Sequence, residues 1–262
     1  MASAARTTSP KENSRLGARR EAVASSKRRR RKIIAGAIAA IVLLGVGGWV
    51  LLHSSLFSAT TIRVTGATHE TSAQVVDAAG LSNHPPLISI QTDKAAAGVE
   101  ALPWVLRATV SLGWPHSVHI AVVERIPVAS LRMGSNVALV DSTGRIVSVT
   151  TSLPAGTGTV PTRVPGLTVH PVGSWVGLAA EPAIHVAATL PPAFKGQVAK
   201  VIGFKDGTVS LRLTTPVTIQ LGTSAQLTQK YRDIASIIAG ATLHPGDVVD
   251  VSVPQASTIT GP

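Results

Sequence analysis

The sequence of 262 residues contains no cysteine. This absence excludes disulfide bonds, thiolate catalysis and cysteine-ligated zinc sites. Aromatic side chains make up only 3% of the residues, so a folded core must be built mainly from Val, Ile, Leu and Ala. Because β-branched side chains favour strands, this composition indicates a fold rich in sheet.

Acidic side chains are also scarce, at 13 Asp and Glu against 24 Lys and Arg, and the formal net charge is +11. The excess lies at one end of the chain. Residues 1–32 hold 11 basic and two acidic side chains, whereas residues 53–262 hold 13 basic and 11 acidic ones. Residues 1–32 show no apolar periodicity and are predicted to form a disordered basic tail. We interpret the tail as a cytoplasmic segment beside anionic lipid rather than as a nucleic-acid-binding arm.

Residues 33–52 form an uncharged run, IIAGAIAAIVLLGVGGWVLL. A helix of this length spans roughly 30 Å, the thickness of a bilayer's hydrocarbon core, so it is predicted to cross the membrane. Nine cations lie in the 20 residues before the run and only Arg63 in the 20 after it, which places the N-terminus in the cytoplasm and the remainder outside. Two alternative interpretations fit less well. A cleaved signal peptide normally has a shorter apolar run than residues 33–52, and a helix on the core of a soluble protein has a polar face, which this run lacks.

The first exported segment predicts a strand, two helices and two strands. Apolar and polar residues alternate in the strands, and helix caps or stops bound the helices. A three-stranded sheet covered by two helices buries one face of each element. The expected ranges are 61–65, 73–79, 92–102, 106–112 and 118–122.

The remainder is dominated by short strand patterns, and the fold class is therefore predicted to be α+β, with a mainly antiparallel second domain and one or two helices. Residues 153–175 are expected to form an extended connection and residues 255–262 a flexible tail. Strands are expected at 128–131, 137–140, 146–149, 198–204, 208–213, 217–221 and 248–253, and helices at 178–190 and 224–239.

The sequence shows no catalytic or metal-binding spacing of the common kinds, such as G-x-S-x-G, H-E-x-x-H or an EF-hand loop. His116 and His119 are three residues apart in or beside a strand, and this spacing directs them to opposite faces. We predict no catalytic residue, no metal ligand and no cofactor.

Several separated stretches resemble the bacterial cell-division family FtsQ, also called DivIB. They cover roughly residues 57–254 and occur in the family's order behind one membrane helix. The stretches are Ile62-Arg63-Val64-Thr65-Gly66, Leu102-Pro103-Trp104-Val105, the run WPHSVHIAVVERIPVA at 114–129, Val140-Asp141-Ser142-Thr143-Gly144-Arg145, and the segment from Lys230-Tyr231 to Asp250-Val251-Ser252-Val253-Pro254. Within residues 153–175 the family's Leu-Pro position corresponds either to Val160-Pro161 or to Val164-Pro165-Gly166.

The resemblance implies a single-pass protein of the divisome at the division septum. It implies a POTRA domain at 57–126 and a β domain at 127–254. The expected partners are FtsB/DivIC-like and FtsL-like proteins, and through them the septal peptidoglycan synthase complex. No catalytic activity of its own is expected. Two other functions remain open, a POTRA-type export or chaperone module and a membrane-anchored cell-wall hydrolase.

Two regions are candidate sites. The junction of the two domains, at Glu124, Arg125 and Pro127, is either a structural ion pair or cap or, as the resemblance implies, a docking seam for another divisome protein. The second is the segment 227–254, whose last strand is either an interior strand or a sheet edge to which a partner adds a strand. The candidate partner-binding residues are Lys230, Tyr231, Arg232, Val249, Asp250, Val251, Ser252 and Val253.

Overall fold

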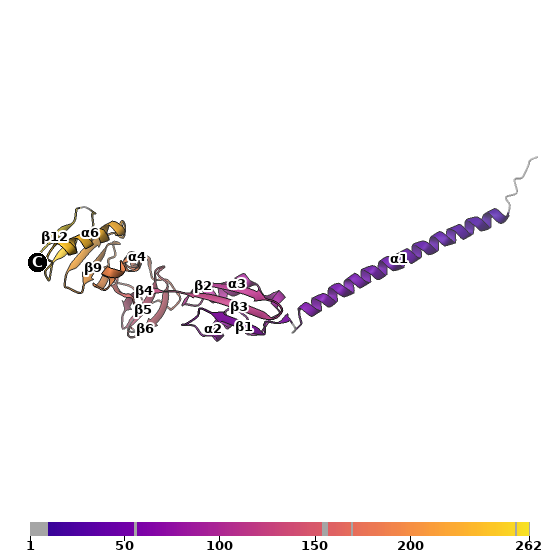
Figure 1. Ribbon diagram of the computed structural model, residues 1–262, viewed down its shortest axis with the longest axis horizontal. Helices are drawn as coiled ribbons and strands as arrows, with labels where there is room; N and C mark the ends of the chain where they lie inside the picture. The colour runs from indigo at the N-terminus through magenta and orange to yellow at the C-terminus, as the bar shows by residue number, and fades with distance from the viewer. Residues whose placement is uncertain (1–9, 55–56, 154–156, 169, 255, 262) are drawn as a thin grey trace, which may run out of the picture.

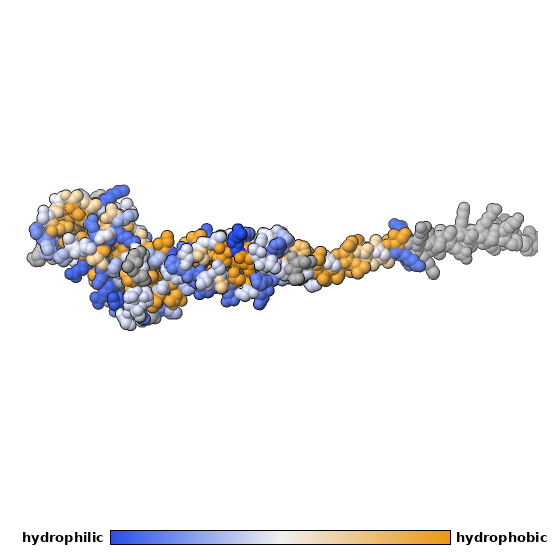
Figure 2. Space-filling view, turned by 60° about the horizontal axis from the view of Figure 1, so that its bottom comes forward, coloured by the Kyte–Doolittle hydropathy of each residue, from blue (hydrophilic) through white to orange (hydrophobic). Residues whose placement is uncertain are grey.

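In the computed structural model the described residues are 10–54, 57–153, 157–168, 170–254 and 256–261, and residues 10–29 are described by their backbone alone. The chain begins with one long helix, α1 (Pro10–Leu52), followed by two folded domains (Figure 1). Within α1 the segment Arg30–Leu52 is long and apolar enough to cross a membrane. Its apolar side chains form a continuous band next to the folded domains (Figure 2). This helix is consistent with single-pass anchoring.

Residues 10–32 belong to α1, although the composition of this region predicts disorder. Ala, Arg, Lys and Glu are good helix formers, and they directly precede an apolar segment that is itself helical. Extending an existing helix avoids the cost of nucleating a new one. The expected disorder is therefore wrong for residues 10–32, and residues 1–9 lie outside the described part.

The domain next to α1, here the proximal domain, is a three-stranded sheet covered by two helices. β1 pairs parallel to β3, and β2 pairs antiparallel to β3 on its other side. Its core contains Val75 of the first helix, Val99 of the second, and Val118 and Ile120 of the sheet, all fully buried. The elements are β1 (Thr61–Thr65), α2 (Ser72–Ala78), η2 (Leu87–Ser89), α3 (Thr92–Glu100), β2 (Val105–Gly113) and β3 (Ser117–Glu124).

The second or distal domain is built on a nine-stranded sheet with the order β12-β11-β10-β9-β8-β7-β4-β5-β6. Five neighbouring pairs are antiparallel and three are parallel, namely β4–β7, β7–β8 and β10–β11. The α+β fold class is thus confirmed. The strands are β4 (Pro127–Met133), β5 (Asn136–Asp141), β6 (Ile146–Thr150), β7 (Val160–Arg163), β8 (Val198–Gly203), β9 (Val209–Leu213), β10 (Thr218–Gly222), β11 (Val248–Asp250) and β12 (Thr258–Thr260).

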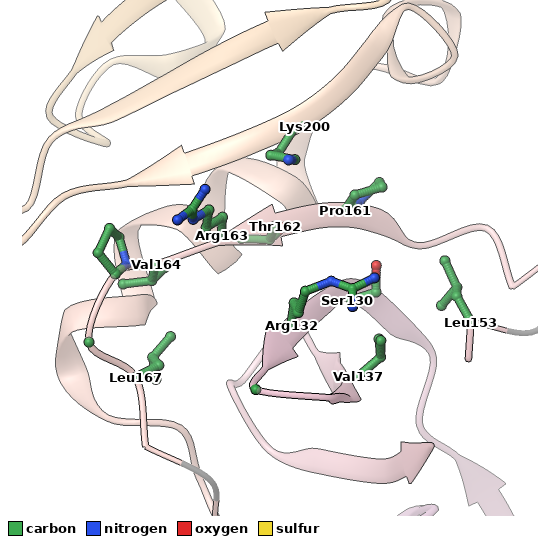
Figure 3. Close-up of a pocket in the computed structure, with 13 residues that line it drawn as sticks. Ser130, Arg132, Val137, Leu153, Pro161, Thr162, Arg163, Val164, Leu167 and Lys200 are labelled. Atoms are coloured by element: carbon green, nitrogen blue, oxygen red, sulfur yellow. The ribbon is translucent and has the colours of Figure 1, made fainter. Parts of the chain in front are cut away.

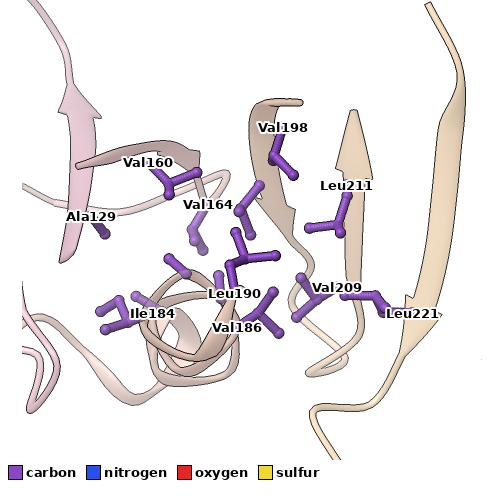
Figure 4. Packing of buried hydrophobic residues seen from close by; sticks show 14 of the residues in the cluster. Ala129, Val160, Val164, Ile184, Val186, Leu190, Val198, Val209, Leu211 and Leu221 are labelled. Carbon is purple, nitrogen blue, oxygen red and sulfur yellow. The ribbon is translucent and has the colours of Figure 1, made fainter. Parts of the chain in front are cut away.

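The helices of the distal domain supply the other half of its core. Ile184 and Val186 of α4 pack with Val160, Val201 and Leu211 of the sheet, and all five side chains are nearly inaccessible to water (Figure 4). Burial of each such side chain contributes about 1.5–3 kcal/mol relative to exposure. The helices are η3 (Leu178–Ala180), α4 (Glu181–Thr189), α5 (Pro192–Lys195) and α6 (Leu227–Gly240).

β7 is one of the strands that the sequence pattern missed. Val160 and Thr162 are buried while Pro161 and Arg163 are exposed, so the strand does alternate. The segment is only four residues long and contains a proline, which lowers a strand prediction. Its parallel neighbours on both sides, β4 and β8, supply the pairing that makes it a strand.

Candidate partner-binding surface and domain junction

The C-terminal edge of the large sheet is formed by β12. The last strand predicted from the sequence, at 248–253, corresponds to β11 and is an interior strand. β11 lies between β10, to which it is parallel, and β12, to which it is antiparallel. The prediction that residues 255–262 form a flexible tail is therefore wrong for 258–260, while 255 and 262 lie outside the described residues. All three residues of β12 are exposed. Its outer side carries the main-chain groups that a further strand would pair with.

β11 is shorter than predicted, and the buried valines are Val249 within the strand and Val251 just after it. Val249 is 2% exposed and Val251 is fully buried. The strand ends at Asp250, whose Oδ1 accepts a hydrogen bond from Ser252 N at 2.8 Å. Val253 is 61% exposed, because the chain has left the sheet before it. A strand over the predicted range 248–253 would place Val249, Val251 and Val253 on one face, and this alternation holds only for the first two.

Lys230 is not available to a partner. Its side chain lies in the core at 1% exposure, and Nζ donates to the carbonyl oxygens of Leu221 and Thr223 at 2.7 and 2.8 Å. Burial lowers the pKa of Lys230, and the Asp250 carboxylate opposes that shift. Lys230 therefore holds α6 to the end of β10. The prediction that Lys230 contacts a partner is corrected, because its side chain is buried in the core.

The two residues that follow Lys230 differ in exposure. Tyr231 is half-buried, and its hydroxyl lies 3.3 Å from the Val186 carbonyl oxygen, to which it donates, and 3.2 Å from Thr189 Oγ1. Burial raises the pKa of Tyr231. Arg232 is exposed. Tyr231 therefore joins α6 to α4, and of the three predicted residues on α6 only Arg232 presents a free charge to solvent.

An apolar groove of about 280 Å³ runs along α6 beside Tyr231. It lies between α5 and α6 and opens to solvent. A groove of this composition and size accepts one or two apolar side chains of a partner. Its lining includes Pro191, Phe194, Ile234, Ala235 and Ile238.

A larger groove of about 640 Å³ lies over β4, β7 and β8 (Figure 3). Arg132 of β4, Arg163 of β7 and Lys200 of β8 extend into it from three adjacent strands. Ser130 and Thr162 supply hydroxyl groups. Among the lining residues no carboxylate or imidazole accompanies the three cations, so the groove lacks a general acid–base pair.

At the junction of the domains, Glu124 accepts four hydrogen bonds from two consecutive residues. The backbone nitrogens of Thr68 and His69 lie 2.6 and 2.8 Å from Oε1, and their side chains both contact Oε2. Partial burial raises the pKa of Glu124, but these hydrogen bonds outweigh burial and lower it to about 2. His69 is also stacked on Trp104, with ring centroids 3.8 Å apart. Glu124 thus fixes the β1–α2 loop.

Arg125 connects the two domains. Its Nε donates to the Val105 carbonyl oxygen at 2.9 Å within the proximal domain, and Nη1 donates to Asp141 Oδ2 at 2.6 Å in the distal domain. Pro127 begins β4 and pairs with Asp141 of β5. Burial raises the pKa of Asp141, but hydrogen bonds from Arg125, Thr143 and Arg145 outweigh it, and the net shift is downward.

Arg145 makes a second connection that sequence reasoning did not assign. Its Nη2 donates to the Ala101 carbonyl oxygen at 2.7 Å, and its guanidinium lies 5.1 Å from the ring centre of Trp175. Arg145 N also donates to Asp141 Oδ1 at 2.9 Å. The Asp-Ser-Thr-Gly turn composition was visible in the sequence and accounts for the contacts of Asp141 with Thr143 and Arg145. Arg125 and Ala101 lie outside the distal domain, and their contacts with this turn leave no local signal.

Two family models match the chain in sequence order. The model for the POTRA domain, FtsQ-type, matches residues 57–125, and the model for the cell division protein FtsQ/DivIB, C-terminal, matches residues 129–252. The chain belongs to the FtsQ/DivIB family. The proximal domain is accordingly its POTRA domain and the distal domain its β domain, and family membership supports a role in the divisome.

Relatives named cell division protein FtsQ are similar over most of the chain. The protein of Streptomyces coelicolor is 29% identical over 239 residues, which cover 86% of each chain. The protein of Mycolicibacterium smegmatis is 26% identical over 81% of this chain and 60% of its own. That of Mycobacterium leprae is 28% identical over 81% of this chain and 58% of its own. The chain thus spans about three fifths of the length of the two mycobacterial FtsQ proteins.

Proposed function

We propose that this FtsQ-family protein is a non-catalytic scaffold of the divisome. Its N-terminus lies in the cytoplasm, α1 crosses the membrane once, and the POTRA domain (57–126) and β domain (127–254) are extracytoplasmic at the septum. It binds FtsB/DivIC-like and FtsL-like proteins and through them helps to control the septal peptidoglycan synthase complex. The observation that carries the proposal is the open edge at β12, behind one membrane-spanning helix, in a chain of this family.

The partner adds a strand to β12. The edge offers main-chain donors and acceptors along Thr258–Thr260, and pairing through the main chain gives affinity that depends little on side-chain identity. Arg232 lies on α6, the helix that contributes Leu227 and Ile234 to the core shared with Val249 and Val251. Acidic side chains near the added segment pair with Arg232, and an apolar side chain enters the groove beside Tyr231.

The partner-binding test uses the full chain in detergent or nanodiscs and the FtsB-like protein of the same organism. Deletion of residues 256–262 removes β12, and the expected result is a large loss of affinity. Thr258→Ala is the matched control, because it retains the backbone of β12 and is expected to bind as the wild type does. Unchanged affinity after the deletion contradicts strand addition at β12.

The cellular test is a fluorescent fusion of the full chain. Septal fluorescence, with filamentation when the protein is depleted, supports the scaffold function. Cell-wall degradation by the purified protein, or uniform membrane fluorescence with normal division on depletion, contradicts it.

A further inference from the structure

One end of the POTRA domain lies next to the outer end of the membrane helix. α1 ends at Leu52, and β1 begins at Thr61. The amide of Thr61 donates to the His116 carbonyl oxygen at 3.1 Å, which places the turn between β2 and β3 beside the start of β1. The rings of Phe57 and Trp114 meet edge to face with centroids 5.9 Å apart. The tip of the β2–β3 hairpin therefore faces the exit of the chain from the membrane.

A second loop reaches the same end. The amide of Ala59 donates to the Pro85 carbonyl oxygen at 3.0 Å, and Ser58 forms a β-bridge with Pro86. Ile88 follows two residues later in η2. It is 47% exposed, and Trp114 in the hairpin turn is 55% exposed. Two large apolar side chains are thus turned to solvent at the membrane end of the domain.

The loops and the hairpin that form this end contain no formal charge. Residues 53–62, 82–90 and 108–123 contain no Lys, Arg, Asp or Glu, although residues 53–262 contain 24 such side chains in all. Charged side chains are found beyond these loops, at Asp93 and Lys94 in the first turn of α3 and at the junction with the β domain, where Glu124, Arg125 and Asp141 form the contacts described above. A hairpin tip that merely faced water would gain nothing from an exposed tryptophan and the absence of charge.

The length of the connection keeps this end close to the bilayer. Phe57 is five positions after Leu52, so even a fully extended chain places Phe57 within roughly 18 Å of the end of α1. The polar interface of a bilayer adds about 5–8 Å to each side of the hydrocarbon core. Tryptophan favours this layer, because its ring is apolar and its indole N–H hydrogen-bonds to water or lipid headgroups.

We propose that Trp114, supported by Ile88, inserts into the lipid interface next to the end of α1, so that the POTRA domain rests on the membrane surface. The contact limits the tilt of the domain about the connection at residues 53–60. The junction at Arg125 holds the β domain to the POTRA domain. The lipid contact therefore also sets the orientation of the β domain and its open edge relative to the membrane. This inference requires α1 to span a bilayer, and it is independent of any divisome partner.

The experiment exploits the absence of native cysteine. Full-length chain with His116→Cys is labelled with a nitroxide and reconstituted in phosphatidylethanolamine–phosphatidylglycerol vesicles. His116 is exposed and adjoins the tip without being the inserted side chain. The matched probe is Leu178→Cys, which is in the β domain and 85% exposed in the wild type. Spin-label accessibility to oxygen, which concentrates in lipid, is compared with accessibility to a water-soluble nickel chelate.

The oxygen-to-nickel accessibility ratio is expected to be several-fold higher at position 116 than at position 178. Adding Trp114→Ser to the His116→Cys chain should lower the ratio to that of position 178, with an unchanged circular dichroism spectrum. Equal ratios at the two positions in the wild-type background overturn the proposal, because the tip then lies in water as position 178 does. A high ratio that Trp114→Ser leaves unchanged also overturns it, because the domain then contacts lipid without the tryptophan.

Discussion

Arg125 Nη1 and Asp141 Oδ2 lie 2.6 Å apart across the junction of the POTRA and β domains, and their side chains are only 9% and 4% exposed. The same guanidinium donates to the Val105 carbonyl oxygen, and the same carboxylate accepts from the Thr143 and Arg145 amides. Each charge is therefore both paired and hydrogen-bonded, the condition under which a buried ion pair is tolerated. This supports the interpretation of the junction as a structural ion pair over that of a docking seam.

Replacing Asp141 by asparagine should destabilise the protein strongly. The substitution leaves the Arg125 guanidinium buried without a counter-charge, and removing one member of a buried pair costs about 3–5 kcal/mol. The measurement is the free energy of unfolding from urea titrations of the full chain in detergent.

Asp206→Asn is the matched control for that experiment. Asp206 accepts from Thr208 N and Oγ1 at 3.0 and 2.7 Å, as Asp141 does from Thr143, but it lies in the exposed β8–β9 turn. The free energy of unfolding is expected to change little in this variant. A similar loss of unfolding free energy in the two variants would show that the turn, and not the ion pair, accounts for the destabilisation.

Glu124 should make the POTRA domain acid-sensitive in a defined pH window. Its pKa is about 2 in the folded protein against an ordinary value of 4.5, so the unfolded chain binds the proton more readily. The stability that Glu124 contributes is therefore fully present above about pH 4.5 and is lost as the pH falls toward 2. Glu124→Gln should have a lower midpoint of thermal unfolding than the wild type at pH 6, and the difference should shrink below pH 4.5. Glu70→Gln, in the same loop, is the control, and an equal pH dependence in both variants would contradict the prediction.

Lys230→Met should destabilise the β domain, whereas Arg232→Met should not. Methionine fills much of the same volume but leaves the Leu221 and Thr223 carbonyl oxygens without their donor, at about 1–3 kcal/mol for a buried unsatisfied group. Arg232 is exposed, so its replacement should leave the unfolding free energy nearly unchanged and lower only the affinity for the FtsB-like partner. Urea titration and partner titration of both variants separate the two roles. Equal stability of the two variants would contradict the burial of Lys230.

Gly98→Ala should destabilise the POTRA domain although alanine is the better helix former. A Cβ at this position of α3 would overlap the Ala78 carbonyl oxygen at the end of α2, and overpacking typically costs 1–3 kcal/mol, more than the roughly 1 kcal/mol gained in helix propensity. Gly240→Ala at the end of α6 meets nothing within 4 Å and is the control. Thermal unfolding should show a lower midpoint for the first and an equal or higher midpoint for the second.

Local patterns were enough to predict most of the elements. α3, β3 and α6 appear where apolar periodicity and flanking stop signals placed them, because these signals depend on residues within one segment. β7 and β12 escaped detection for the opposite reason. Each is only three or four residues long and is a strand because other strands supply its hydrogen bonds, β4 and β8 for β7 and β11 for β12.

The sequence by itself determined that one segment is long and apolar enough to cross a membrane, that the fold is α+β and that there are no disulfides, because each follows from composition or from the periods of single segments. The tertiary structure alone decided that Lys230 is buried, that β12 and not β11 is the edge, that Arg125 meets Asp141 and that Trp114 adjoins Phe57. The three side-chain contacts among these join residues 9 to 57 positions apart in the chain. Sheet order and domain packing set them, and no local period encodes either.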